Sequence, residues 1–117
     1  MTRFALQFGQ TRPGLVYRER AVAYGLCADG AGRLALARIG RETGGFVYDL
    51  PGGWLEANED EPSALVREFQ EETGLIVQVR GLLCRAGQYW INGEEPRNSL
   101  ASFFVADQAG AAGAPSE

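Results

Sequence analysis

The sequence predicts a single α/β domain built on a mixed β-sheet. One segment carries the signals of an amphipathic helix, and strand-like segments rich in apolar residues lie on both sides of it. That order is typical of a sheet with a helix packed on its face. The chain has 117 residues, of which 45% are hydrophobic and 22% are charged. Length and composition therefore suit one globular domain with one core.

Four strands are expected before the helix. An apolar stretch at residues 4–8 predicts the first strand, and residues 22–28 predict the second. The turn signal Asp-Gly-Ala-Gly at residues 29–32 predicts a hairpin that returns along residues 33–39. A further short strand is expected at residues 46–50.

The helix itself has recognisable start and stop signals. Asp60 is a suitable N-cap residue, and Pro62 falls in the first turn, where a missing N–H costs little. Gly74 is the residue type expected just after the last turn. The apolar face that would pack on the sheet consists of Leu65, Val66 and Phe69.

Strands are also expected after the helix. Residues 75–91 predict one long or two short strands, residues 92–98 a turn-rich loop, and residues 100–106 a final strand. From residue 107 onward small and polar residues dominate, so residues 107–117 are predicted to form a disordered tail. The domain is accordingly expected to span residues 1–106.

Charge and residue usage exclude several classes of function. The net charge of −4 argues against an extended nucleic-acid surface and against an anionic-membrane surface. The chain has no histidine, which excludes histidine acid–base chemistry and histidine metal sites. It also has no lysine, since all eleven basic residues are arginine. A bound metal would need oxygen ligands, which favours a hard cation such as Mg²⁺ or Mn²⁺.

The two cysteines, Cys27 and Cys84, are predicted to be buried thiols in strands. They form no CxxC pair, so neither a zinc site nor a disulfide framework is indicated. The first ten residues hold no apolar stretch of signal-peptide length, and no segment approaches the length of a membrane span. A cytoplasmic location is therefore expected.

Three glutamates of the predicted helix share one face. Glu68, Glu71 and Glu72 stand at positions i, i+3 and i+4. Like charges at these spacings repel one another, and the C-terminal end of a helix disfavours anions. A divalent cation bound between the carboxylates would turn this cost into a binding site.

The region around this helix resembles the Nudix box. That motif reads Gly, five residues, Glu, seven residues, Arg-Glu, an apolar residue, any residue, Glu-Glu, any residue, Gly and an apolar residue. Every fixed position is filled here, by Gly53, Glu59, Arg67, Glu68, Phe69, Glu71, Glu72, Gly74 and Leu75. The resemblance extends to Pro51 and Gly52, just before the box, and to the strand-like segments on both sides.

The resemblance implies an activity and a set of roles. Nudix hydrolases use Mg²⁺ or Mn²⁺ to cleave the pyrophosphate of a nucleoside diphosphate linked to another group, by attack of water on phosphorus. The metal ions would be held by Glu68, Glu71 and Glu72, with the backbone carbonyl of Gly52 as a further ligand. Arg67 and Glu59 would fix the loop against the helix, and Arg67 is expected to point away from the middle of the carboxylate face.

The resemblance also implies a fold, an α/β/α sandwich with a mixed sheet. The family's C-terminal helix is expected to be missing here, because the sequence after residue 106 resembles neither a strand nor a helix. A sheet face left bare would expose apolar surface. We therefore expect either that the domain is truncated at its C-terminus or that a partner subunit covers this face. Nudix proteins are often dimers, and a homodimer is kept as an option.

The chemistry of the residues agrees with these roles. The anionic oxygens of pyrophosphate repel a nucleophile, and metal ions held by carboxylates neutralise that charge. Adjacent glycines let the backbone approach a metal or phosphate closely. The general base stays open among Glu72, Glu94 and Glu95.

Four aromatic residues have two readings. Tyr89, Trp90, Phe46 and Tyr48 are candidates for stacking on a nucleobase, although strand aromatics more often belong to the core. The sequence does not name the nucleotide: Trp90 stands where ADP-ribose enzymes of the family tend to carry proline.

Two alternatives to an enzyme remain. One is a non-catalytic Nudix-like domain that binds a nucleotide for regulation, and the other is an acidic cation-binding helix in a structural protein. The intact set of three glutamates favours the enzyme over the first. The positions of Gly53, Glu59 and Arg67 speak against the second.

Overall fold

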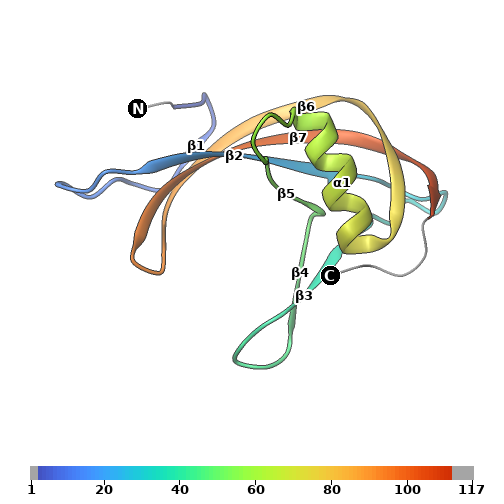
Figure 1. The fold of residues 1–117 in the computed structure, drawn as a ribbon, viewed down its shortest axis with the longest axis horizontal. Coiled ribbons are helices and arrows are strands. Elements are labelled where there is room, and N and C mark those ends of the chain that lie inside the picture. Colours follow the sequence, from blue (N-terminus) through green and yellow to red (C-terminus); the bar gives the residue numbers. More distant parts are fainter. Residues whose placement is uncertain (1–2, 112–117) are drawn as a thin grey trace.

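The fold is a mixed β-sheet with one helix packed on one face. The computed structural model describes residues 3–111, and Figure 1 shows the arrangement of its elements. In chain order they are β1 (Gln7–Phe8), β2 (Arg18–Leu26), β3 (Ala37–Gly40), β4 (Phe46–Asp49), β5 (Gly52–Trp54), α1 (Glu61–Thr73), β6 (Leu75–Asn92) and β7 (Glu95–Ala111).

The main sheet has five strands in the order β1-β6-β7-β2-β5. β2 runs parallel to β7 and β1 runs parallel to β6, whereas β6 with β7 and β2 with β5 are antiparallel. The predicted mixed sheet is therefore confirmed. β3 and β4 form a separate two-stranded antiparallel sheet, which projects below the main sheet in Figure 1.

The hairpin predicted between residues 22–28 and 33–39 is not formed as a ladder. Only an isolated bridge joins Ala28 to Leu34. Residues 18–26 instead form a central strand, which pairs with β7 on one side and β5 on the other. Local turn chemistry suggested the nearest partner in sequence, but long-range pairing buries more of this strand.

The β6–β7 pair is longer than predicted at both ends. The residues predicted as a loop, 92–98, are mostly strand, because the chain reverses within a two-residue turn whose first residue is Gly93. Gly93 has φ 65°, which glycine adopts without strain. At the other end β7 continues to Ala111, so residues 107–111 are strand and not tail. The rest of the predicted tail lies outside the described residues.

The core lies between α1 and the sheet. Buried side chains from the helix, β6 and β7 meet those from β2 and the residue that follows it. The cluster contains Ala23, Cys27, Leu65, Phe69, Val77, Phe104 and Ala106. This confirms two residues of the predicted apolar helix face as core, while the third, Val66, is partly buried at its edge.

Close contact between helix and sheet depends on Gly25 in β2. A Cβ atom on this residue would lie 2.9 Å from a ring carbon of Phe69 and 3.0 Å from a methyl carbon of Leu65. Glycine therefore lets α1 pack closely on β2.

The opposite face of the sheet carries no helix among residues 3–111, in line with the expected lack of the family's C-terminal helix. Within the same residues, no helix combines the length and the hydrophobicity that a membrane crossing requires. Both cysteines are free, Cys27 buried and Cys84 half-buried.

Candidate active site

The two ends of α1 set the register of its glutamates. The Asp60 carboxylate accepts a hydrogen bond from the backbone N–H of Ser63 at 2.8 Å, and this bond lowers the pKa of Asp60. At the other end Gly74 adopts a left-handed conformation, φ 77°, and its N–H donates to the Gln70 carbonyl at 2.9 Å. Both predicted caps are confirmed.

A two-bond contact joins the loop before the helix to the helix. Arg67 Nε donates to Glu59 Oε2 at 2.8 Å, and Arg67 Nη2 donates to Glu59 Oε1 at 3.0 Å. Glu59 also accepts from the backbone N–H of Glu56 at 3.0 Å. These bonds, the one from Arg67 first, lower the pKa of Glu59 to about 2. The loop is thereby tied to the middle of α1.

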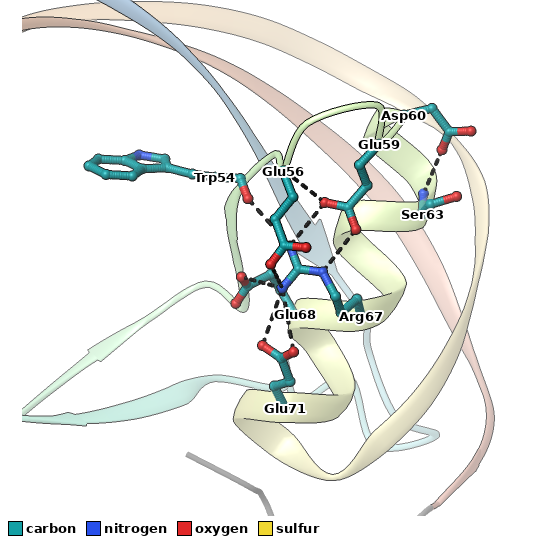
Figure 2. A network of polar contacts seen from close by, with 8 residues as sticks. All are labelled: Trp54, Glu56, Glu59, Asp60, Ser63, Arg67, Glu68 and Glu71. Atoms are coloured by element: carbon teal, nitrogen blue, oxygen red, sulfur yellow. Dashed lines mark hydrogen bonds and ion pairs between the residues drawn. The ribbon is translucent and has the colours of Figure 1, made fainter.

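Arg67 was expected to point away from the middle of the carboxylate face, but its guanidinium contacts the carboxylates. Its Nη1 lies 2.9 Å from Glu68 Oε1, 3.3 Å from Glu71 Oε2 and 3.6 Å from Glu56 Oε1. With Glu59, one guanidinium therefore contacts four carboxylates (Figure 2). Arg67 stands four residues before Glu71, so these two side chains are neighbours on the helix surface, and the long Arg67 side chain also reaches Glu68. The positive charge of the Arg67 guanidinium therefore offsets the predicted repulsion between the glutamates.

The two glycines of β5 bring the sheet edge against these acids. A Cβ on Gly53 would lie 2.7 Å from the carboxyl carbon of Glu68. The N–H of Gly52 donates to Glu72 Oε1 at 2.8 Å. Gly52 has φ 150°, and a side chain there would collide with the carbonyl oxygen of Ala23. Gly52 thus lets β5 lie close to β2, and Gly53 leaves room for the Glu68 carboxylate of α1.

Comparison with known proteins decides the family. A family model described as NUDIX domain matches residues 17–116. The chain belongs to the Nudix family.

Relatives and solved structures agree with this assignment. An ADP-ribose pyrophosphatase from Methanocaldococcus jannaschii is 42% identical over 64 residues, which is 54% of this chain. The match spans only 36% of that relative's length. The MutT protein of Methanosarcina mazei Go1 aligns with TM-score 0.69 and 21% identity, over 89% of this chain and 75% of that one. A MutT NUDIX hydrolase from Burkholderia pseudomallei gives 0.67 and 24%, over 86% and 75%. At these identities the two structures show a shared fold.

Nudix proteins generally use divalent metals, and the donor set here fits a hard cation. Glu68 and Glu71 both contact a single cationic nitrogen, so the two carboxylates can share one positive charge. All the side-chain donors are carboxylate oxygens, the ligands that Mg²⁺ prefers. Over residues 3–111, no group of three or more acidic or cysteine side chains is gathered tightly enough to hold an ion. Side-chain movement, including that of Arg67, would have to accompany metal binding.

Glu94 and Glu95 lie far from the Nudix helix. They stand at the turn between β6 and β7, at the end of the sheet remote from α1 (Figure 1). Glu95 pairs with Arg97 at 2.9 Å and with Arg18 at 3.4 Å. The structure therefore does not bring these two candidate bases to the site, and Glu72 is the candidate that remains.

The four predicted aromatics separate into two groups. Tyr89 is buried and packs edge-on against Tyr17, so it belongs to the core. Phe46 and Tyr48 are 56% and 66% exposed, which shows that the core reading was wrong for them. Trp90 is 37% exposed and lines a small pocket on the sheet face opposite α1.

Two pockets border the acidic face of the Nudix helix. One, of about 770 Å³, lies between α1 and the start of β6 and includes Arg67 and Glu71 in its wall. The other, of about 440 Å³, is lined by Glu72 together with residues of β3 and β4, among them Arg38 and Phe46. The Arg38 guanidinium lies 3.6 Å from the centre of the Phe46 ring. Sequence reasoning missed Arg38, because nothing in its local pattern indicates which side chain of α1 it will approach.

Sequence analysis also did not single out Tyr24. It lies in β2 on the face opposite α1 and stacks on Phe103, with ring centres 5.5 Å apart. Burial raises the pKa of Tyr24, and the charges of Asp49 and Glu72 raise it further. The alternation of small and large residues along β2 was the available signal, since Ala23 and Gly25 face the helix and Tyr24 lies between them.

Proposed function

We propose that this Nudix domain is a Mg²⁺-dependent hydrolase, with Mn²⁺ as an alternative cofactor. It cleaves the pyrophosphate bond of a nucleoside diphosphate linked to another moiety, by attack of water on phosphorus. The main support is the placement of Glu68, Glu71 and Glu72 along one side of α1, against the two glycines of β5.

Each side chain has a proposed role. Glu68 and Glu71 hold the metal, joined by Glu72 and the backbone carbonyl of Gly52. A bound Mg²⁺ would neutralise the charge of the pyrophosphate oxygens and acidify a water molecule. Glu72 receives the proton of the attacking water on its carboxylate, and its bond from the Gly52 N–H fixes that carboxylate in place.

Arg67 and Glu59 act by positioning. Their two-bond contact holds the loop against the helix, so that β5 stays beside the glutamates. When a metal is bound, Arg67 would give up the contacts of its Nη1 to Glu68 and Glu71 but keep those to Glu59, since the latter use Nε and Nη2. Loss of either residue would then alter the geometry of the acids without removing a ligand.

The substrate class follows from the family and the neighbouring aromatic surface. Similarity to an ADP-ribose pyrophosphatase makes ADP-ribose the first compound to test. Phe46 borders the pocket that Glu72 lines, so a nucleobase could stack there while the phosphates reach the acids. The partner is thus a small nucleotide.

The alternative is a regulatory Nudix domain that binds a nucleotide without turnover. The complete set of acids favours hydrolysis, because binding alone does not need three carboxylates. A cytoplasmic location is proposed on the free thiols of Cys27 and Cys84, which suit a reducing compartment. The homodimer is proposed from the family alone.

The test is a product screen with Mg²⁺ over ADP-ribose, nucleoside diphosphate sugars, dinucleotides and modified nucleoside triphosphates. The matched proteins are wild type, Glu71→Gln and Glu72→Gln, which remove charge but keep shape. We expect one compound class to be cleaved and both variants to lose activity by about 100-fold or more. Tight nucleotide binding without any product would favour the regulatory alternative.

A further inference from the structure

We propose that Arg97 and Arg20, which both lie on the ring of Trp54, form a binding site for a phosphate-type oxyanion on the sheet face opposite α1. This goes beyond the hydrolase function and uses none of the Nudix glutamates. It starts from Arg97, a charged residue that is 8% exposed.

Arg97 has buried donors that no group satisfies. Its Nη2 donates to Glu95 at 2.9 Å, but Nε and Nη1 are buried and have no hydrogen-bond partner within residues 3–111. A guanidinium stays protonated in proteins and accepts no hydrogen bond. Buried donors without acceptors are rare in native proteins, so a missing acceptor is the natural explanation.

A second guanidinium lies against the same indole ring. The Cζ atoms of Arg20 and Arg97 are 3.7 Å and 4.3 Å from the Trp54 ring centre. Arg18 follows on the same strand face and pairs with Glu95, the carboxylate that also binds Arg97. Arg18 and Arg97 thus share one carboxylate, and Arg20 adds a further positive charge two residues along β2 from Arg18.

The strand register places this site away from α1. Trp54 pairs with Val22 and Gly53 with Ala23, and successive side chains point to opposite faces. Gly53 faces Glu68 on α1, so Trp54 faces the other way, as Figure 2 shows for its indole ring. The carbonyl of Trp54, in contrast, accepts a hydrogen bond from Arg67 at 3.4 Å. A single residue therefore connects the arginine pair to the loop of the Nudix box.

The adjoining space can admit a ligand. A pocket of about 230 Å³ next to the arginines is lined by Trp54, Trp90 and Ser99, among others. Trp90 is the cross-strand neighbour of Arg97. Because Arg97 is 8% exposed, an anion reaches its nitrogens only when neighbouring side chains move, and the Trp54 ring is one of those in contact with it. Tetrahedral oxyanions suit the site, since each of their oxygens can accept from a guanidinium.

The experiment follows the emission of Trp54 during titration with inorganic phosphate, at constant ionic strength and with EDTA instead of Mg²⁺. The full chain carries Trp90→Phe, which leaves Trp54 as the only tryptophan. We expect a saturable change in emission and a rise in Tm. Arg97→Gln and Arg20→Gln should each weaken phosphate binding by about tenfold or more.

Arg80→Gln is the matched control, because it removes an exposed guanidinium that pairs with Asp107 and lines neither the pockets beside the Nudix glutamates nor the pocket beside Trp54. It should leave the titration unchanged. Arg20 is exposed, so its variant tests the site even if Arg97→Gln folds poorly. A wild type that does not respond, or an Arg20→Gln protein that binds phosphate as tightly as wild type, overturns the proposal.

A parallel titration with a nucleoside monophosphate separates two sources of the anion. Tighter binding than inorganic phosphate assigns the site to a nucleotide phosphate, and equal binding assigns it to free phosphate. Both results support the arginine site. Because Mg²⁺ is absent and no bond is cleaved, the outcome is independent of whether the domain proves to be a hydrolase.

Discussion

The carboxylate of Glu68 packs directly against the α-carbon of Gly53, so closely that a single added methyl group would lie 2.7 Å from its carboxyl carbon. This contact joins the first fixed residue of the Nudix box to the first acid of its glutamate set. The contact explains why glycine occupies position 53: a residue without a side chain leaves room for the Glu68 carboxylate.

Gly53→Ala should therefore displace Glu68 without unfolding the protein. Gly53 does not have a positive φ, so alanine fits the backbone, and the clash involves the end of a flexible side chain. We expect turnover to fall by about 100-fold, since small misplacements of a catalytic group have effects of that size. Steady-state kinetics and a thermal melt check both expectations.

Gly81→Ala is the matched control. Gly81 also lies in a strand, lacks a positive φ, and has no atom within 4 Å of the position its Cβ would take. Its activity should equal that of wild type. If both alanine variants kept full activity, the packing of Glu68 on β5 would not matter for function.

Arg67→Gln should make the protein more dependent on Mg²⁺. Arg67 is the cation among four carboxylates, so its loss leaves them to repel one another; they belong to Glu56, Glu59, Glu68 and Glu71. We expect Tm without metal to fall by about 4 °C or more. The rise in Tm on adding millimolar Mg²⁺ should exceed that of wild type, because the ion no longer competes with the guanidinium.

Differential scanning fluorimetry with a Mg²⁺ series measures both effects. Arg80→Gln is a suitable control, since Arg80 forms only an exposed pair with Asp107 at 3.5 Å. An equal or smaller response to Mg²⁺ in Arg67→Gln than in wild type would show that Arg67 and the ion do not share the same carboxylates.

Acid should break the contact between the loop and the helix. The pKa of Glu59 is about 2 in the folded protein and 4.5 ordinarily. A lowered pKa means that the ionised Glu59 stabilises the fold fully above pH 4.5, and that this contribution is lost as the pH falls from 4.5 towards 2. Wild type should melt above Glu59→Gln at pH 7, and the difference should shrink through that window.

The comparison needs a glutamate outside the contact. Glu42 lies exposed in the loop between β3 and β4, and Glu42→Gln should differ little from wild type at any pH. A Tm difference between wild type and Glu59→Gln that stayed constant from pH 7 to pH 3 would contradict the assignment of the lowered pKa.

Sequence alone was sufficient for the helix and for the spacing of its acids. Asp60 and Gly74 cap it as predicted, since caps depend on local backbone chemistry. The i, i+4 spacing of Arg67 and Glu71 could have indicated their contact, whereas the contact of Arg67 with Glu68 could not be predicted, because a long side chain can reach several neighbours. Glu94 and Glu95 were misplaced for a different reason, since the length of the β6–β7 hairpin determines where its turn lies.

Sheet pairing shows the same limit. The Asp29 carboxylate does close a tight turn, accepting from the N–H groups of Ala31 and Arg33 at 2.8 Å and 3.0 Å. The turn was predicted from its residues, but the strand before it pairs with β7, which lies about 80 residues later in the sequence. Residue patterns specify which face is buried and not which distant strand will be the neighbour.

Phe46→Ala should weaken substrate binding more than it slows chemistry. Phe46 is 56% exposed, and its ring helps to line the pocket that Glu72 also lines. If a nucleobase stacks on it as proposed, removing the ring should raise KM by about tenfold with little change in kcat.

Val16→Ala, at a position that is 88% exposed, serves as the control because Val16 lies outside that pocket. Steady-state kinetics on the substrate found in the product screen would decide the matter. An unchanged KM would direct the search for the base-binding surface to the pocket between α1 and β6, where Val66 and Val77 supply the apolar wall.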